Sequence, residues 1–343
     1  MESQNSNLDV VESSAAIPKT LKFEFKGDGT EYFKIWIVNV LLTIITFGIY
    51  SAWAKVRNNR YFYSNLYLDG SNFRYLAEPL TILKGRIIAV VAFIIYSFVS
   101  TAAPMLGMAF AVALIFAIPY FVNQSLAFNH RMSAYRNIQF RFKASYGEAF
   151  MVLYVWPLLG MLTLGILYPM AFLKLNQYIV RNSSYGTTNF DFHATYKDYG
   201  MIFLVLLGVG VMAALLVAVI VQFVPVASGL VPLLTMAVYL GLILYFIVST
   251  TNLYYRSLTI KDHQFDATLD ISSLGLVILK NALLVAVTFG LYLPAAKVRM
   301  TKYMAENIVM EAQGSLDDFA AAEQENISAL GEEFGQVFDF GLS

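Results

Sequence analysis

The chain has 343 residues, of which 58% are hydrophobic and 13% are charged, whereas an average soluble domain has roughly 45–50% apolar and 25% charged residues. This composition excludes an ordinary soluble protein. The formal net charge is zero, but the first 302 residues contain all 23 bases against 14 acids, and the remaining residues contain nine acids and no base. We therefore expect a basic membrane body followed by an acidic tail. Cysteine is absent, which excludes disulfides and thiolate chemistry.

Five apolar segments follow an N-terminal stretch that has no features of a signal peptide. Residues 1–20 lack a basic n-region and an apolar h-region, so we expect a disordered cytoplasmic tail. The apolar segments span residues 34–54, 87–128, 149–173, 201–250 and 274–296. The second and fourth are double length and are interrupted by Pro and Gly, which predicts two transmembrane helical hairpins.

The three shorter segments repeat one sequence pattern. A Thr-x-Gly-[Ile/Leu] motif recurs at 46–49, 163–166 and 288–291. In each copy an Ala follows the Gly at six residues, a base at nine, a Tyr at thirteen and an Asn at seventeen. We infer three divergent internal repeats, at about 21–75, 138–192 and 263–315.

Short alternating runs between the apolar segments predict strands. Residues 23–26 and 140–143 alternate aromatic and charged side chains, and 67–75 and 185–192 have the pattern of hairpins. We expect these strands to form a small cytoplasmic sheet on the helical bundle. The acidic segment 303–343 contains an interrupted amphipathic helix, which is expected to pack on this sheet or to bind a partner. Its apolar face would carry Phe319, Leu330, Phe334, Val337 and Phe338.

Several further motifs carry a resemblance to a known family. They are the run from Phe33–Trp36 to Gly48–Arg57, the turn Leu68–Phe73, and the ending Ala329–Phe334 with Phe338–Phe340. In these motifs the chain resembles the YjgN-like family of bacterial inner-membrane proteins over about residues 21–343. The resemblance implies a bacterial inner-membrane location, but it implies no activity and no catalytic residue, since the family is a domain of unknown function. The middle copy departs from the pattern at Leu167, where Tyr50 and Tyr292 stand in the other copies.

The distribution of bases predicts the topology. The loop 55–86 contains six Lys and Arg, 131–143 contains four and 174–197 contains three, whereas the turns inside the two hairpins contain none. The positive-inside rule then places every long loop and both termini in the cytoplasm. This requires re-entrant repeat segments that fold back at Thr-x-Gly and leave four full crossings, the arrangement we favour, with a pocket or pathway around the breaks. The rival arrangement has seven crossings and an inverted middle repeat.

Two groups of candidate site residues follow from the repeats. The candidate pathway or hinge residues are Thr46, Gly48, Thr163, Gly165, Thr288 and Gly290, with Asn39 and Asn281. The candidate contacts to an anionic solute or lipid are Arg57, Lys174 and Arg299, each with a Tyr four residues later: Tyr61, Tyr178 and Tyr303. Other roles stay open for all of these residues. The more common role of such bases is anchoring at the membrane edge, and that of such amides is hydrogen bonding between helices. An interfacial aromatic belt explains the tyrosines equally well.

No motif in the sequence indicates an enzyme. His130, His193 and His263 lack metal-ligand spacing, and there is no nucleophile elbow, zinc-protease motif or phosphate-binding loop. We therefore expect no catalytic residue, no metal, no cofactor and no nucleic-acid partner.

The predicted fold is an all-α polytopic membrane protein with three repeats, two transmembrane hairpins and short cytoplasmic β-strands. Its membrane domain covers residues 21–302, and 303–343 form an acidic cytoplasmic tail. The favoured function is a transporter or channel-like protein for a small solute or a lipid, with an anionic ligand as one option. The alternative is a non-transporting scaffold or envelope-assembly factor. The lipid bilayer and its anionic lipids are the expected partners, and a homo-oligomer or a cytoplasmic partner of the tail stays open.

Overall fold

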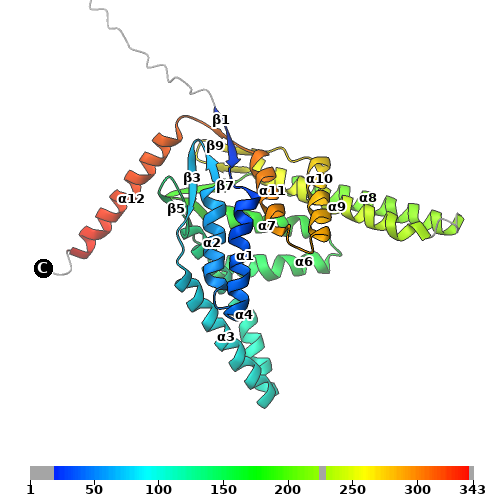
Figure 1. Ribbon diagram of the computed structural model, residues 1–343, viewed down its shortest axis with the longest axis horizontal. Helices are drawn as coiled ribbons and strands as arrows, with labels where there is room; N and C mark the ends of the chain where they lie inside the picture. Colours follow the sequence, from blue (N-terminus) through cyan, green and yellow to red (C-terminus); the bar gives the residue numbers. More distant parts are fainter. Residues whose placement is uncertain (1–18, 224–228, 340–343) are drawn as a thin grey trace, which may run out of the picture.

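Ten short strands form a closed antiparallel barrel at the centre of the protein (Figure 1). The structure is a computed structural model that describes residues 19–223 and 229–339, with side chains through residue 328. The strands are β1 (Lys19–Phe25), β2 (Leu66–Leu68), β3 (Ser71–Tyr75), β4 (Ser133–Tyr135), β5 (Ile138–Phe142), β6 (Ser183–Tyr185), β7 (Thr188–Phe192), β8 (Leu258–Ile260), β9 (His263–Ala267) and β10 (Ile308–Ala312). Each strand pairs with its neighbours in sequence, and β1 with β10 closes the ring, with Lys19 opposite Ala312.

The barrel corrects the predicted fold class, because an all-α fold with a small sheet on its surface is wrong. The hairpins expected at 67–75 and 185–192 are present as β2–β3 and β6–β7. They are parts of one closed barrel, however, in which every strand has two neighbours. A closed barrel leaves no unpaired strand edge. Most of its strands have only three to five residues, so the period-2 signal in each is weak.

Five helical hairpins connect consecutive strands around the barrel. The first is α1 (Gly29–Ile45) with α2 (Ser51–Ser64), and the second is α3 (Pro79–Ala102) with α4 (Pro104–Arg131). In the third, α5 (Tyr146–Phe150), the π-helix η1 (Met151–Val155) and α6 (Trp156–Leu162) form one limb and α7 (Tyr168–Arg181) the other. The fourth is α8 (Tyr196–Phe223) with α9 (Val231–Arg256), and the fifth is α10 (Ile271–Val287) with α11 (Leu293–Glu306).

All five hairpins leave the barrel at the same end. The two strands that flank each hairpin are paired antiparallel, for example β1 with β2 around α1–α2, so both limbs join the barrel at one rim. We call this rim the helix end, and we call the opposite rim, which carries the tight turns, the turn end. A repeat segment that crossed the membrane once would have to enter and leave on opposite sides. The geometry therefore fits the four-crossing arrangement with re-entrant repeats.

Helix length separates the two kinds of hairpin. In the described residues α3, α4, α8 and α9, with 24 to 28 residues, are long and apolar enough to span a membrane. They reach furthest from the barrel, in two different directions (Figure 1). By contrast, α1 and α10 have 17 residues each, which is about 25 Å at 1.5 Å per residue, less than a hydrocarbon core of about 30 Å. Residues 224–228, which include Pro225 in the break expected within the fourth hairpin, lie outside the described residues.

The last helix, α12 (Leu316–Asp339), begins at the turn end of the barrel and extends outward (Figure 1). The segment predicted as a separate tail thus starts inside α11, supplies the closing strand β10 and then forms α12. Of its expected apolar face, Phe319 packs on the barrel core. The side chains of Leu330, Phe334, Val337 and Phe338 lie outside the described residues, as do residues 1–18 of the predicted N-terminal tail.

Candidate functional site

The barrel encloses a cavity of about 270 Å³ that is lined by all ten strands. On the strands the lining residues are Phe23, Leu66, Leu68, Phe73, Tyr135, Phe140, Tyr185, Phe190, Leu258, Ile260, Phe265 and Met310, and α12 adds Leu316. We call this cavity the lumen. Every lining side chain is aliphatic, aromatic or a thioether. The two tyrosine hydroxyls are already bonded, because Tyr135 donates to the Leu68 carbonyl at 2.8 Å and Tyr185 to the Tyr135 carbonyl at 3.1 Å. The lumen therefore presents no free polar side chain.

Five phenylalanines, one on each odd-numbered strand, form a ring inside the lumen. They are Phe23, Phe73, Phe140, Phe190 and Phe265. Each is partly buried and precedes a charged residue in its strand, whose side chain points outward. Neighbouring rings approach closely, as in Phe140 and Phe190, whose centroids lie 6.4 Å apart. The alternation that predicted strands at residues 23–26 and 140–143 thus has a specific cause: the aromatic positions face the lumen.

The first three turns of α12 cover the turn end of the lumen. Leu316 lines the cavity, and Phe319 stacks on Tyr185 with ring centroids 5.8 Å apart. Ala320 is buried in the same core cluster, and Ile327 packs against it. We call this part of α12, Leu316–Ile327, the lid.

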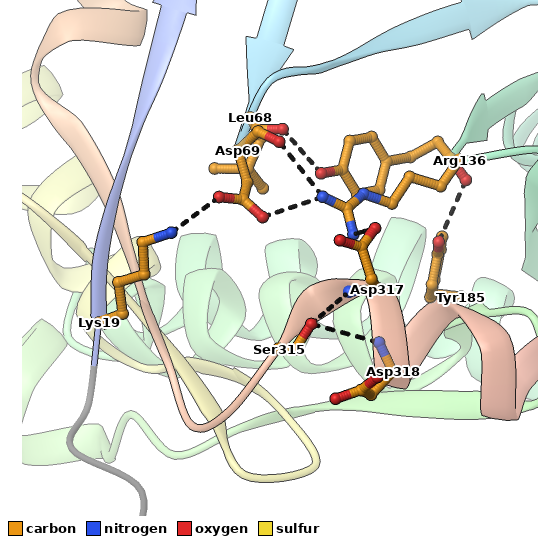
Figure 2. Close-up of polar contacts among 9 residues, drawn as sticks. Lys19, Leu68, Asp69, Arg136, Tyr185, Ser315, Asp317 and Asp318 are labelled. Atoms are coloured by element: carbon orange, nitrogen blue, oxygen red, sulfur yellow. Dashed lines mark hydrogen bonds and ion pairs between the residues drawn. The ribbon is translucent and has the colours of Figure 1, made fainter.

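A network of charges fixes the start of the lid (Figure 2). Arg136, in the β4–β5 turn, donates to a carboxylate oxygen of Asp69 at 2.9 Å and to Asp317 of the lid at 2.5 Å. Lys19 of β1 reaches the other oxygen of Asp69 at 3.1 Å. The side chain of Arg136 is 9% exposed, whereas that of Asp317 is 83% exposed. The guanidinium of Arg136 is therefore the most buried charge of the network. Loss of Asp69 or Asp317 would leave it buried with fewer partners, which is costly in free energy.

Glu323 forms the second attachment of the lid and is 3% exposed. Its carboxylate accepts hydrogen bonds from the Thr187 backbone N–H and the Thr187 hydroxyl, both at 2.7 Å, and from the Thr188 hydroxyl. Burial by itself would raise the pKa of Glu323, but the hydrogen bonds from Thr188 and Thr187 outweigh burial and lower it. The carboxylate is thus ionised at neutral pH. Gly186 makes room for it, since a Cβ there would lie 2.5 Å from the carboxylate.

His263 forms the third attachment, where β10 leads into the lid. Its Nδ1 accepts a hydrogen bond from the Gln313 backbone N–H at 3.1 Å, and its ring lies edge-on to Phe319. Burial lowers the pKa of His263, and Lys261 adds to this effect while Asp262 opposes it. The imidazole is therefore neutral at pH 7, as an acceptor nitrogen requires.

The predicted pathway residues lie at the tips of the three short hairpins, away from the lumen. Thr46, Thr163 and Thr288 each donate to the carbonyl four residues earlier at 2.7 Å and accept from the backbone N–H four residues later. Gly48, Gly165 and Gly290 have φ between +91° and +97°, a conformation that glycine adopts without steric cost. The residue before each Gly is at least 95% exposed. At these tips the motif builds a turn whose backbone polar groups are satisfied within the hairpin, which suits a tip placed in lipid.

The two predicted amides and two of the three predicted bases have hydrogen-bond partners within their own hairpins. Asn39 donates to Asn58 at 2.9 Å, and Asn281 accepts from Arg299 at 3.2 Å and donates to the Ala296 carbonyl at 3.3 Å. Lys174 bonds Gln177 at 3.3 Å. Arg57 lines an open cleft between α2 and β3. Arg57, Lys174 and Arg299 therefore lie on three separate hairpins and do not form one site.

The three tyrosines are buried or half-buried at the base of their hairpins. The Tyr61 hydroxyl bonds both the backbone N–H and the carbonyl of Asp28 at 2.8 Å, and Tyr303 bonds Ser273 at 2.8 Å. Tyr178 donates to Asn123 of α4 at 2.5 Å. In the outer two copies the tyrosine therefore ties the end of the second helix to the start of the first.

Sequence reasoning missed the lumen, the phenylalanine ring and the attachments of the lid. The phenylalanines of the five strands are present in the sequence, but no local pattern shows that they face one common lumen. Among the described residues no group of three His, Asp or Glu side chains is placed to hold a metal.

Comparison with known proteins places this architecture in a family. The chain matches inner membrane protein YjgN of Salmonella typhimurium at 33% identity over 143 residues, which is 41% of this chain and 36% of that protein. It matches inner membrane protein YjgN of Escherichia coli K12 at 30% identity over 152 residues, 43% and 37% of the two chains. The alignments thus span little more than a third of these relatives. No solved structure matches the chain.

The names of these relatives and the four apolar helices together support a location in the inner membrane. The model of a family described as bacterial protein of unknown function, DUF898, matches residues 20–337, which is nearly the whole chain. The chain therefore belongs to the DUF898 family, which agrees with its resemblance to YjgN-like proteins.

Proposed function

We propose that this protein is a lipid carrier of the bacterial inner membrane that holds an apolar chain in the lumen of its barrel. The observation that carries the proposal is the chemistry of the lumen wall, in which no charged side chain and no free polar side chain occurs. Moving an ion or a polar solute into such a space costs several kcal/mol without compensating hydrogen bonds. An apolar chain gains about 0.8 kcal/mol for each buried methylene.

The size and position of the lumen support the same ligand class. Its volume of about 270 Å³ lies near the lower limit of the roughly 300–1,000 Å³ typical of ligand sites, which suits part of one acyl chain rather than a whole phospholipid. The helix end of the barrel adjoins hairpins that insert into the bilayer, and the lid closes the other end. In this orientation the turn end, the lid and both termini face the cytoplasm, as the basic loops favour.

Binding of fatty acids of increasing chain length to the purified protein in neutral detergent tests this function. We expect saturable binding with a preferred chain length. Phe140→Ala removes one member of the phenylalanine ring and should shift the preference to a longer or bulkier chain. Arg141→Ala is the matched control, because Arg141 is exposed on the same strand and should bind as the wild type does.

Transfer of the bound lipid between liposomes then distinguishes a carrier from a scaffold. A carrier moves labelled lipid at a rate that falls when the lumen is filled, for example by Leu258→Trp. Absence of acyl-chain binding at every length, or identical binding by Phe140→Ala and Arg141→Ala, would contradict the proposal and favour the scaffold.

A further inference from the structure

We propose that a cleft between α2 and β3 binds the phosphate group of an anionic phospholipid. The cleft has a volume of about 590 Å³ and is open to the outside of the barrel wall. Three arginines line it, Arg57 and Arg60 from α2 and Arg74 from β3, together with the polar side chains of Ser64 and Asn72. No acidic side chain belongs to its lining among the residues that the structure describes. The cleft shares only Phe73 with the lining of the lumen, and the proposal does not depend on the function proposed for the lumen.

Two of the three guanidinium groups are held in place without being neutralised. Arg60 donates to the Ala77 carbonyl at 3.0 Å, and Arg74 donates to the side-chain oxygen of Asn137 at 2.9 Å. Both acceptors are uncharged, so each arginine keeps its charge and its remaining donors. Within residues 19–223 and 229–328, none of the three arginines takes part in an ion pair. Guanidinium groups of this kind bind phosphate oxygens through paired N–H donors.

Two other units of the fold neutralise the charge at the equivalent positions with an ion pair. In two other units the last residue of a helix pairs with an outward-facing acid ten residues later: Arg181 with Asp191 at 3.1 Å, and Arg256 with Asp266 at 3.4 Å. The same two positions beside the cleft hold Ser64 and Arg74. Arg74 thus stands where the other two units have an acid, and Ser64, which is uncharged, stands where they have an arginine. The neutral pair of those two units is thus an excess of positive charge here, as it is at Arg131 and Arg141, and only beside α2 do Arg57 and Arg60 add two further bases in the same cleft.

The depth of the cleft matches the level of lipid phosphates. Arg57 lies nine residues after Gly48 at the hairpin tip, which is about 14 Å along a helix. The tip carries Phe47, which is 98% exposed and apolar, so we place it in the hydrocarbon. About 14 Å is half the thickness of a hydrocarbon core of about 30 Å. A tip at the bilayer centre therefore brings Arg57 to the cytoplasmic interface, where Trp53, one turn nearer the tip, suits the interfacial zone.

The test measures the thermal stability of the whole protein in neutral detergent while one additive is titrated. The three additives are phosphatidylglycerol, phosphatidylcholine and inorganic phosphate. We expect saturable stabilisation by phosphatidylglycerol and no saturable effect of phosphatidylcholine, whose choline opposes the arginines. Inorganic phosphate should bind at least tenfold more weakly than phosphatidylglycerol, because it lacks the glycerol and chain contacts. Equal binding of inorganic phosphate would identify a free phosphate as the ligand and overturn the lipid assignment.

The double variant Arg57→Gln/Arg74→Gln removes two charges from the cleft and keeps hydrogen-bonding amides at both positions. It should weaken binding of phosphatidylglycerol by at least tenfold and leave acyl-chain binding in the lumen unchanged. Arg141→Gln is the matched control, since Arg141 is the equivalent exposed base on β5 and lies outside the cleft. Equal binding by the double variant and the wild type overturns the proposal. An equal loss in the Arg141→Gln control also overturns it, because the attraction would then be a general surface effect.

Discussion

Replacing Glu323 with Ala should open the lid without unfolding the barrel. The carboxylate is 3% exposed and accepts three hydrogen bonds from Thr187 and Thr188. A hydrogen bond to a charged group contributes roughly 1.5–3 kcal/mol net. In the variant the two hydroxyls can rotate toward water, whereas the Thr187 N–H is fixed by the backbone. We therefore assign the full free energy to the bond from the Thr187 N–H and only a small part of it to each hydroxyl bond. The free energy of lid docking should then fall by about 2–4 kcal/mol.

Because 1.4 kcal/mol is a factor of ten in an equilibrium constant, this loss should raise the open fraction of the lid by roughly 30- to 700-fold. The absence of cysteine makes the measurement direct. Ala320→Cys places one thiol on the buried face of the lid itself, at a position that is 9% exposed. Its rate of reaction with a maleimide reports the open fraction when the lid recloses faster than the thiol reacts. Glu325→Ala is the control, because Glu325 lies on the same helix and is exposed. A change of less than threefold for Glu323→Ala would refute the reasoning.

Three further predictions follow from the same geometry. His263 has a lowered pKa, so protonation opposes docking of the lid. The labelling rate at Ala320→Cys, divided by that of an exposed cysteine at the same pH, should therefore rise as pH falls below about 6.5 but not in His263→Gln. A Cβ at Gly107 would lie 2.7 Å from the Ser100 backbone, so Gly107→Ala should destabilise the α3–α4 hairpin by about 1–3 kcal/mol in thermal unfolding. In intact cells an impermeant maleimide should label Met105→Cys from outside, label Asp262→Cys only after lysis, and never reach Phe47→Cys in lipid.

Each of these has an outcome that would contradict it. Unchanged pH dependence in His263→Gln would assign the acid sensitivity to another group. Gly85 has open space around it, so an equal loss of stability in Gly85→Ala would show that helix propensity, and not the close approach at Gly107, sets the effect. Labelling of Asp262→Cys from outside would place the barrel in the periplasm and reverse the orientation argued from the basic loops.

The sequence alone is sufficient for the membrane character, the helical hairpins and several strands. Helix length and apolar content are local properties, so the spans at 79–102, 104–131, 196–223 and 231–256 follow from composition. The Thr-x-Gly turns are also local, because a hydroxyl four residues from its partners and a glycine at positive φ need no distant contact. The same holds for the Asp-Gly turn between β2 and β3.

The tertiary structure alone decides that ten short strands close into a barrel. Lys19 pairs with Ala312, nearly the length of the chain away, and no local pattern encodes that register. Closure turns five separate phenylalanines into one ring, and it brings Arg136, Asp69 and Asp317 from three distant segments together. Tyr61 and Tyr303 likewise find their partners across a hairpin. The physical reason is that a strand of three to five residues gains stability only from its neighbours, so the lumen and its lid exist only when the whole ring has formed.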